Sequence, residues 1–182
     1  MNALVVYDTR YGNTARVAEA ITAGVSAGGV RADCAKAQEV SADDWPRYAL
    51  VVVGTPVQMG GPSPAVRALL ASTSKLWMDG AMQGRLGAAF ATFGGLGGAG
   101  GGVELTLISI WATFAELGML CAPCPKVLEG FADAGLHWGL AVRSADAQGM
   151  PLAELPPAAL KAARAFGAYL AELIVRAPRQ TR

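Results

Sequence analysis

The sequence predicts an α/β protein in which helices cover both faces of a doubly wound parallel β-sheet. Five short apolar runs alternate with segments of helical periodicity along the 182 residues. Parallel neighbours need helical crossovers, and because these are right-handed, the helices are placed on both faces of the sheet. The composition, with 53% hydrophobic and 16% charged residues, excludes a disordered chain and suits one domain with a large core.

The first half of the chain contains three predicted strands and two predicted helices. Asn2–Tyr7 is a short apolar run that ends in turn residues, which indicates a buried strand. Asn13–Ala27 carries alanine, isoleucine and valine at roughly helical spacing, and the glycine pair at 28–29 ends that helix. The other elements expected here are a weaker strand at Val30–Ala37, a turn at Asp43–Arg47, a central strand at Ala49–Gly54 and a helix at Pro64–Leu70.

The second half continues the alternation and then becomes irregular. Leu86–Phe93 is an apolar strand, and the glycine-dense loop Gly94–Gly102 leads into a helix at Val103–Leu117. The remaining expectations are a short strand at Met119–Ala122, an irregular segment at about 123–155, a last helix at Pro157–Val175 and a loose tail at 177–182. Residues 1–176 are therefore expected to form a single domain.

Charge and cysteine content narrow the class of protein. Lys and Arg number 15 and Asp and Glu 14, which gives a net charge of +1. This charge creates no broad positive electrostatic potential that would attract nucleic acid or an anionic membrane. The uncharged segment Leu86–Val103 contains eight glycines, which excludes a membrane helix, and the N-terminus lacks the basic region of a signal peptide. The odd count of three cysteines fits a reducing compartment, so we expect a cytoplasmic protein.

Three loops follow the carboxyl ends of predicted strands, namely Thr9–Thr14, Thr55–Gly61 and Phe93–Gly102. Doubly wound sheets bind ligands beyond the carboxyl ends of the strands, at the point where the strand order reverses. Although they are distant in sequence, the three loops are therefore expected to meet around one site.

The first loop has the composition of a phosphate site. It offers hydroxyls on Thr9 and Thr14, an amide on Asn13 and backbone N–H groups at a helix start, while Gly12 permits a tight turn. The Gly-x-x-x-x-Gly-Lys-Ser/Thr pattern of a triphosphate loop is absent. An ordinary helix cap with turn residues remains the alternative interpretation of the same segment.

The loops also resemble those of a known family. The run Leu4-Val-Val-Tyr-Asp-Thr-Arg-Tyr-Gly-Asn-Thr14 looks like the phosphate loop of the flavodoxin superfamily, and Gly54-Thr-Pro-Val-Gln-Met-Gly60 resembles its second loop. Three later runs are similar to the WrbA-type NAD(P)H:quinone oxidoreductases: Leu76-Trp-Met-Asp-Gly-Ala-Met82, Gly100-Gly-Gly-Val-Glu-Leu-Thr106 and Trp111-Ala-Thr-Phe-Ala-Glu-Leu-Gly-Met119. The resemblance spans about residues 2–175.

The resemblance implies a flavodoxin-like, five-stranded parallel sheet in the order 2-1-3-4-5 and FMN as the cofactor. Three groups of residues would hold FMN: Thr9, Arg10, Tyr11, Gly12, Asn13 and Thr14 the phosphate; Pro56, Val57, Gln58, Met59 and Gly60 one side of the isoalloxazine; Phe93, Gly94, Gly95, Leu96, Gly97 and Gly98 the other side. Trp77, from the same chain or a neighbouring subunit, would line the cleft where nicotinamide or quinone stacks.

Some further residues carry alternative interpretations. His137, beside Trp138, either faces the cleft and donates a proton to a reduced quinone or is simply exposed. Cys121 and Cys124 form a Cys-x-x-Cys that is either structural or a redox pair, and a zinc site would need four ligands, for which Cys34 and His137 are the only other Cys or His residues. The Gly-x-Gly-x-x-Gly match at 95–100 is either a dinucleotide fingerprint or a chance match in a glycine-rich window.

Two classes of function follow. The first is an FMN-dependent oxidoreductase that takes electrons from NAD(P)H as co-substrate and passes two of them to a small-molecule quinone. The alternative is a non-enzymatic flavodoxin-like electron carrier, or a binding protein of this fold with weak or lost FMN binding. By the resemblance we also expect a homo-oligomer, either a dimer or a tetramer, with no nucleic-acid or membrane partner.

Overall fold

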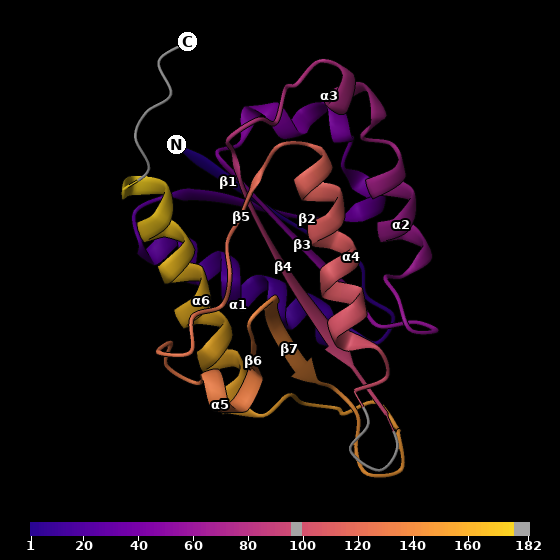
Figure 1. The fold of residues 1–182 in the computed structure, drawn as a ribbon. Helices are drawn as coiled ribbons and strands as arrows, with labels where there is room; N and C mark the ends of the chain where they lie inside the picture. Colours follow the sequence, from indigo (N-terminus) through magenta and orange to yellow (C-terminus); the bar gives the residue numbers. More distant parts are fainter. Residues whose placement is uncertain (96–99, 177–182) are drawn as a thin grey trace.

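The computed structural model describes residues 1–95 and 100–176, and a twisted sheet crosses its centre (Figure 1). Strands β1 (Asn2–Tyr7), β3 (Leu50–Pro56) and β4 (Leu86–Phe93) lie side by side and parallel in the middle of this sheet. Strand β2 (Arg31–Lys36) pairs in parallel with β1 and forms one edge. The predicted order 2-1-3-4 is therefore confirmed.

The fifth position of the sheet is divided between two short strands. β5 (Leu120–Cys121) pairs with the first two residues of β4, and β7 (Gly139–Arg143) pairs with the last four, both in parallel. Between them lie α5 (Phe131–Ala134) and β6 (Gly135–Leu136), which is antiparallel to β7. Among the described residues the sheet thus has seven strands rather than five, in the order β2-β1-β3-β4-β7-β6 with β5 also on β4.

The expectation of an irregular segment at 123–155 is wrong for its middle part. β7 has only five residues, begins with Gly139 and follows His137 and Trp138, so its short apolar run is only a weak strand signal. Its extended form depends on pairing with the carboxyl half of β4, which is distant in sequence.

Helices cover both faces of the sheet, as predicted. α1 (Asn13–Ala27) and α6 (Pro157–Arg176) pack together on one face. The other face carries α2 (Pro64–Ala71), α3 (Ser74–Met78) and α4 (Val103–Glu116), together with the short 3₁₀ helices η1 (Ala37–Glu39) and η2 (Ala42–Arg47).

Side chains alternate between the two faces of the sheet, so each central strand contributes to the core beneath both layers of helices. Val5 and Phe90 point into the core beneath α1 and α6, whereas Val6 and Ala91 point into the core beneath α2 and α4. All four are fully buried. Central strands buried on both faces read as continuous apolar runs, which is why they are the easiest elements to predict.

Two glycines allow α1 and α6 to touch backbone to backbone. A Cβ placed on Gly24 would lie 2.0 Å from the carbonyl oxygen of Arg164, and one on Gly167 would lie 2.1 Å from that of Ile21. Neither position has room for a side chain, so the close contact between these helices depends on both glycines.

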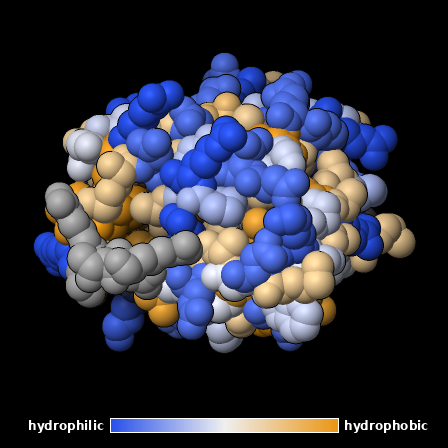
Figure 2. Space-filling view, turned by 90° about the horizontal axis from the view of Figure 1, so that it is seen from above, coloured by the Kyte–Doolittle hydropathy of each residue, from blue (hydrophilic) through white to orange (hydrophobic). Residues whose placement is uncertain are grey.

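Figure 2 views the end of the molecule near α3 and the N-terminus, where hydrophilic residues predominate and hydrophobic ones appear in small groups. No described helix is long and apolar enough to cross a membrane. The expected loose tail at 177–182 lies outside the described residues.

Candidate cofactor site

The carboxyl ends of β1, β3, β4 and β7 converge on one cavity of about 170 Å³. Between β1 and β3 the order of the sheet reverses, which is the position where doubly wound folds bind ligands. The described lining residues are Thr9, Arg10, Tyr11, Asn13, Thr14, Pro56, Val57, Gln58, Thr92, Gly94, Ser144, Ala145, Gly149 and Pro151. The three loops expected to meet therefore do so.

The first loop presents an uncapped helix N-terminus beside this cavity. Gly12, with φ 86°, precedes α1, and its N–H donates to the Thr9 hydroxyl at 3.0 Å. Among the described residues no side chain caps α1, and its first turn contains no acidic residue. The first N–H groups of the helix, with the positive end of its dipole, therefore favour an anion at this place.

Asn13 and Thr14 have roles that differ from those expected of phosphate ligands. The Asn13 amide donates to the carbonyl oxygens of Leu152 at 3.0 Å and Ser144 at 3.5 Å, and the Thr14 hydroxyl shares a 2.8 Å hydrogen bond with that of Thr92. Both side chains are almost fully buried and join α1 to distant segments. For an anion, the loop therefore offers the Thr9 hydroxyl, backbone N–H groups and Arg10.

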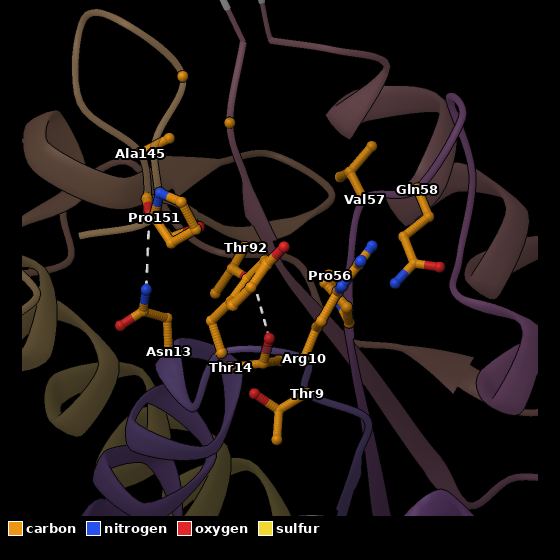
Figure 3. Close-up of a pocket in the computed structure, with 14 residues that line it drawn as sticks. Thr9, Arg10, Asn13, Thr14, Pro56, Val57, Gln58, Thr92, Ala145 and Pro151 are labelled. Atoms are coloured by element: carbon orange, nitrogen blue, oxygen red, sulfur yellow. Dashed lines mark hydrogen bonds between the residues drawn. The ribbon is translucent and has the colours of Figure 1, made fainter. Parts of the chain in front are cut away.

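Arg10 is the one charged side chain among the described residues that line the cavity. Its guanidinium carbon lies 5.3 Å from the centre of the Tyr11 ring, a cation–π arrangement that orders a long exposed side chain. Figure 3 shows Arg10 extending from the first loop towards Pro56 on the second. Its charge adds to the preference for an anionic ligand.

The second loop contributes Pro56, Val57 and Gln58 to the wall, but not the other two residues predicted there. Gln58 and Gly61 exchange two backbone hydrogen bonds, at 2.9 and 3.1 Å, which close a tight turn. Met59 and Gly60 at its tip have positive φ of 49° and 76°, and Met59 is fully exposed. The turn directs both residues away from the cavity in this chain.

The third loop is described at its start, residues 93–95, and at its end, residues 100–102. Gly94 lines the cavity, whereas Phe93 and Gly95 do not. The Phe93 carbonyl instead accepts the backbone N–H of Ser144 at 2.8 Å. The predicted contacts of Leu96, Gly97 and Gly98 lie outside the described residues, as does most of the Gly-x-Gly-x-x-Gly match.

Five lining residues were missed by the sequence-based hypothesis. Thr92 is the penultimate residue of β4 and pairs with Thr14. Ser144, Ala145, Gly149 and Pro151 belong to the segment after β7, which sequence reasoning treated as irregular. A signal existed in the apolar Gly139–Val142 run, followed by a turn with Asp146 and Gly149, which is the strand-then-loop pattern of the other three loops.

Trp77 does not reach the cavity within its own chain. It is 58% exposed and lines a separate depression with Leu70, Met78, Thr113 and Glu116. α3 follows α2, which returns to the end of the molecule where the strands begin, as Figure 1 shows. The expectation that Trp77 lines the cleft of the same chain is therefore wrong, and a contribution from a neighbouring subunit stays a prediction.

His137 is also absent from the cavity. It is exposed in the β6–β7 turn and stacks on Phe131 with ring centres 5.7 Å apart, while Trp138 packs edge-on against Trp111 at 5.5 Å. β7 runs parallel to β4, so His137 precedes its amino end while only its carboxyl end enters the site. The predicted proton-donating role in this cavity is wrong for the single chain.

Cys121 and Cys124 have the character of structural residues. All three are free thiols, and Cys121 donates weakly to the Trp111 carbonyl at 3.8 Å. Burial raises the pKa of the Cys124 thiol to about 12, which keeps it protonated and unreactive at neutral pH. The described residues contain no cluster of His, Cys, Asp and Glu suited to a metal ion.

The donor set fits the FMN that the loops predict. A phosphate monoester matches the uncapped α1 N-terminus, the Thr9 hydroxyl and Arg10. An aromatic ring matches the apolar side chains of Pro56, Val57, Ala145 and Pro151. Figure 3 shows Pro56 and Val57 on one side of the cavity and Ala145 and Pro151 on the other.

Comparisons with known proteins agree with this geometry. The flavodoxin family profile matches residues 5–105. A protein named NAD(P)H dehydrogenase (quinone) from Paraburkholderia phymatum is 32% identical over 70% of this chain and 72% of its own, and one of the same name from Gluconacetobacter diazotrophicus is 30% identical over the same shares. The crystal structure of a WrbA-like flavodoxin from Agrobacterium tumefaciens superposes with a TM-score of 0.71 at 25% identity, over 96% of this chain and 98% of that one.

Proposed function

Because the chain belongs to the flavodoxin family, we propose that it is an FMN-dependent oxidoreductase that takes electrons from NAD(P)H and passes two of them to a quinone. Two relatives of about 30% identity that are named for this reaction support the proposal. The observation that carries it is the cavity at the sheet reversal, which joins an anion-binding helix N-terminus to an apolar slot.

When bound, FMN supplies the redox chemistry, accepting a hydride and releasing two electrons to a second substrate. The residues of this chain bind and orient it. The first turn of α1, with Thr9 and Arg10, holds the phosphate, while Pro56 and Val57 bound the slot for the ring. Tyr11, which lines the cavity and is 62% exposed, leaves its rim open to a flat second substrate.

The decisive experiment is to purify the protein, load it with FMN and record its visible spectrum before and after adding NADH or NADPH with a benzoquinone. Yellow protein that bleaches with the nicotinamide and recovers with the quinone supports the proposal. Yellow protein without turnover indicates the electron carrier. Protein that does not take up FMN indicates the binding protein and contradicts the enzyme.

We also propose that the chain acts as a homo-oligomer, a dimer or a tetramer, in the cytoplasm. Leu105 and Ile108 of α4 are 67% and 39% exposed, one turn apart, which suits burial against a second copy. Light scattering at micromolar concentration tests this, with Leu105→Glu expected to release monomers. The three free cysteines fit a reducing compartment.

A further inference from the structure

The segment 144–151, here called the fourth loop, contains no helix or long strand, but hydrogen bonds hold it in place. Its two ends pair through a bridge between Ala145 and Pro151, and the Leu152 N–H donates to the Ser144 carbonyl at 2.9 Å. Within it, one carboxylate oxygen of Asp146 accepts the N–H groups of Gln148 and Met150 at 2.9 and 2.8 Å. These contacts give the loop one defined shape.

Two side chains outside the loop hold it against the cavity. Arg143 donates to the carbonyl oxygens of Ala145, Gly95 and Asp146 at 3.2, 2.7 and 3.4 Å, which ties the fourth loop to the third. From the opposite side, the buried Asn13 amide donates to Ser144 and Leu152, which ties it to the start of α1. The fourth loop is therefore coupled to the first and the third of the three predicted flavin-binding segments.

The side of the fourth loop that faces the cavity is apolar. Ala145, Gly149 and Pro151 line the cavity together with Ser144, whose hydroxyl is directed to the Phe93 carbonyl at 3.3 Å. The carbonyl oxygens of residues 144–146 accept hydrogen bonds from Arg143, Asn13 and backbone N–H groups. Such a surface suits the apolar ring of a ligand and has no charged group for a phosphate.

We propose that the fourth loop is a wall of the flavin site that contacts the non-phosphate part of FMN, and that Asn13 and Arg143 are positioning residues that hold it there. This inference rests on the proposed function. It changes the role of Asn13 from a phosphate ligand to an anchor of the loop. It also gives Arg143 a role in flavin binding although Arg143 does not line the cavity.

Comparing FMN with riboflavin, which lacks the phosphate, tests the assignment. Asn13→Ala and Arg143→Met are expected to weaken the binding of both flavins to a similar extent, with Kd raised about tenfold, or about 1.4 kcal/mol. Arg10→Ala is expected to weaken FMN more than riboflavin, because it removes only an anion contact. Flavin fluorescence quenching measures the Kd values without any turnover assay, and Arg176→Met, on the far end of α6, is the matched control.

Hydrogen exchange at residues 144–152 gives a second readout that does not need flavin. Asn13→Ala and Arg143→Met are expected to speed exchange there while leaving β1 and β3 protected, which separates a loosened loop from a misfolded chain. Pro151→Ala, which keeps both anchors, is expected to weaken both flavins equally. The inference is wrong, while the proposed function stands, if the wild type binds FMN and the Asn13→Ala and Arg143→Met variants bind both flavins as tightly as the wild type. The same holds if these variants lose affinity for FMN but not for riboflavin. If the wild type binds neither flavin, both fail.

Discussion

Thr14 and Thr92 join the first loop to the end of β4 through one buried hydrogen bond of 2.8 Å. Thr92→Val keeps the shape of the side chain but leaves the Thr14 hydroxyl without that partner. We expect a loss of about 1–3 kcal/mol in the free energy of unfolding, measured by urea denaturation. Because two apolar groups need no hydrogen bond, the double variant with Thr14→Val should lose less than the sum of the two single variants. Strict additivity would contradict the coupling.

Cys124 gives the stability a dependence on alkaline pH. Burial raises the pKa of its thiol from an ordinary 9.0 to about 12, so at pH 8 and below the group is almost entirely protonated in both folded and unfolded chains. Between pH 9 and 12 the unfolded chain loses the proton first, and stability falls. Between pH 8 and pH 10 the free energy of unfolding of the wild type should fall by about 1 kcal/mol more than that of Cys124→Ala. Equal losses in urea titrations would show that the thiol is not buried in solution.

The side chains of the first loop show what the sequence could not predict at the scale of single residues. Gly12 and its turn, the helix start and the position of Thr9 follow from residue types next to each other in the chain. The partners of Asn13 and Thr14 are residues 144, 152 and 92, and no local pattern indicates such pairings. Which polar groups remain available to a ligand therefore required the structure.

The contact between α1 and α6 depends on Gly24 and Gly167, where a Cβ would fall about 2 Å from a backbone oxygen. Gly167→Ala must therefore separate the two helices. We expect a loss of about 1–3 kcal/mol in the free energy of unfolding, despite the better helix propensity of alanine. Gly61→Ala is the matched control, since a Cβ there meets nothing within 4 Å. A Gly167→Ala variant as stable as wild type in urea would contradict this packing.

At the scale of elements, the predicted strands and helices with strong patterns agree with the structure. β1, β4 and α1 match their predicted bounds, because continuous apolar runs and helical spacing are local signals. β7 was missed because its five residues are held by pairing with β4 and not by their own pattern. Because β7 was missed, the fourth loop that follows it was missed too, and the interpretation that His137 faces the cleft was wrong.

At the scale of the whole molecule, the cavity links flavin binding to stability. A ligand that binds only the folded chain stabilises it by about 2.7 kcal/mol at a hundredfold excess over its Kd, which corresponds to about 5–10 °C in Tm for a chain of this length. We expect FMN to raise the Tm by this amount. Riboflavin at the same concentration should raise it less, because it lacks the phosphate that α1 and Arg10 favour. Equal shifts for both ligands, followed by calorimetry, would argue against a phosphate site in the first loop.

The divided fifth position of the sheet has a consequence for how the chain tolerates change. Cys121 and Leu140 are partners of Gly87 and Phe90, which are three residues apart on β4, or about 10 Å. The intervening excursion thus departs from and rejoins the sheet at almost the same place. Since closing a longer excursion adds little entropic cost, insertions at the exposed residues Lys126 and Val127 can be accommodated without disturbing the register on either side, whereas deletions that reach the buried Cys124 or Ala134 cannot. This exposed stretch is a natural place to graft a new recognition module while the candidate cofactor cavity stays intact.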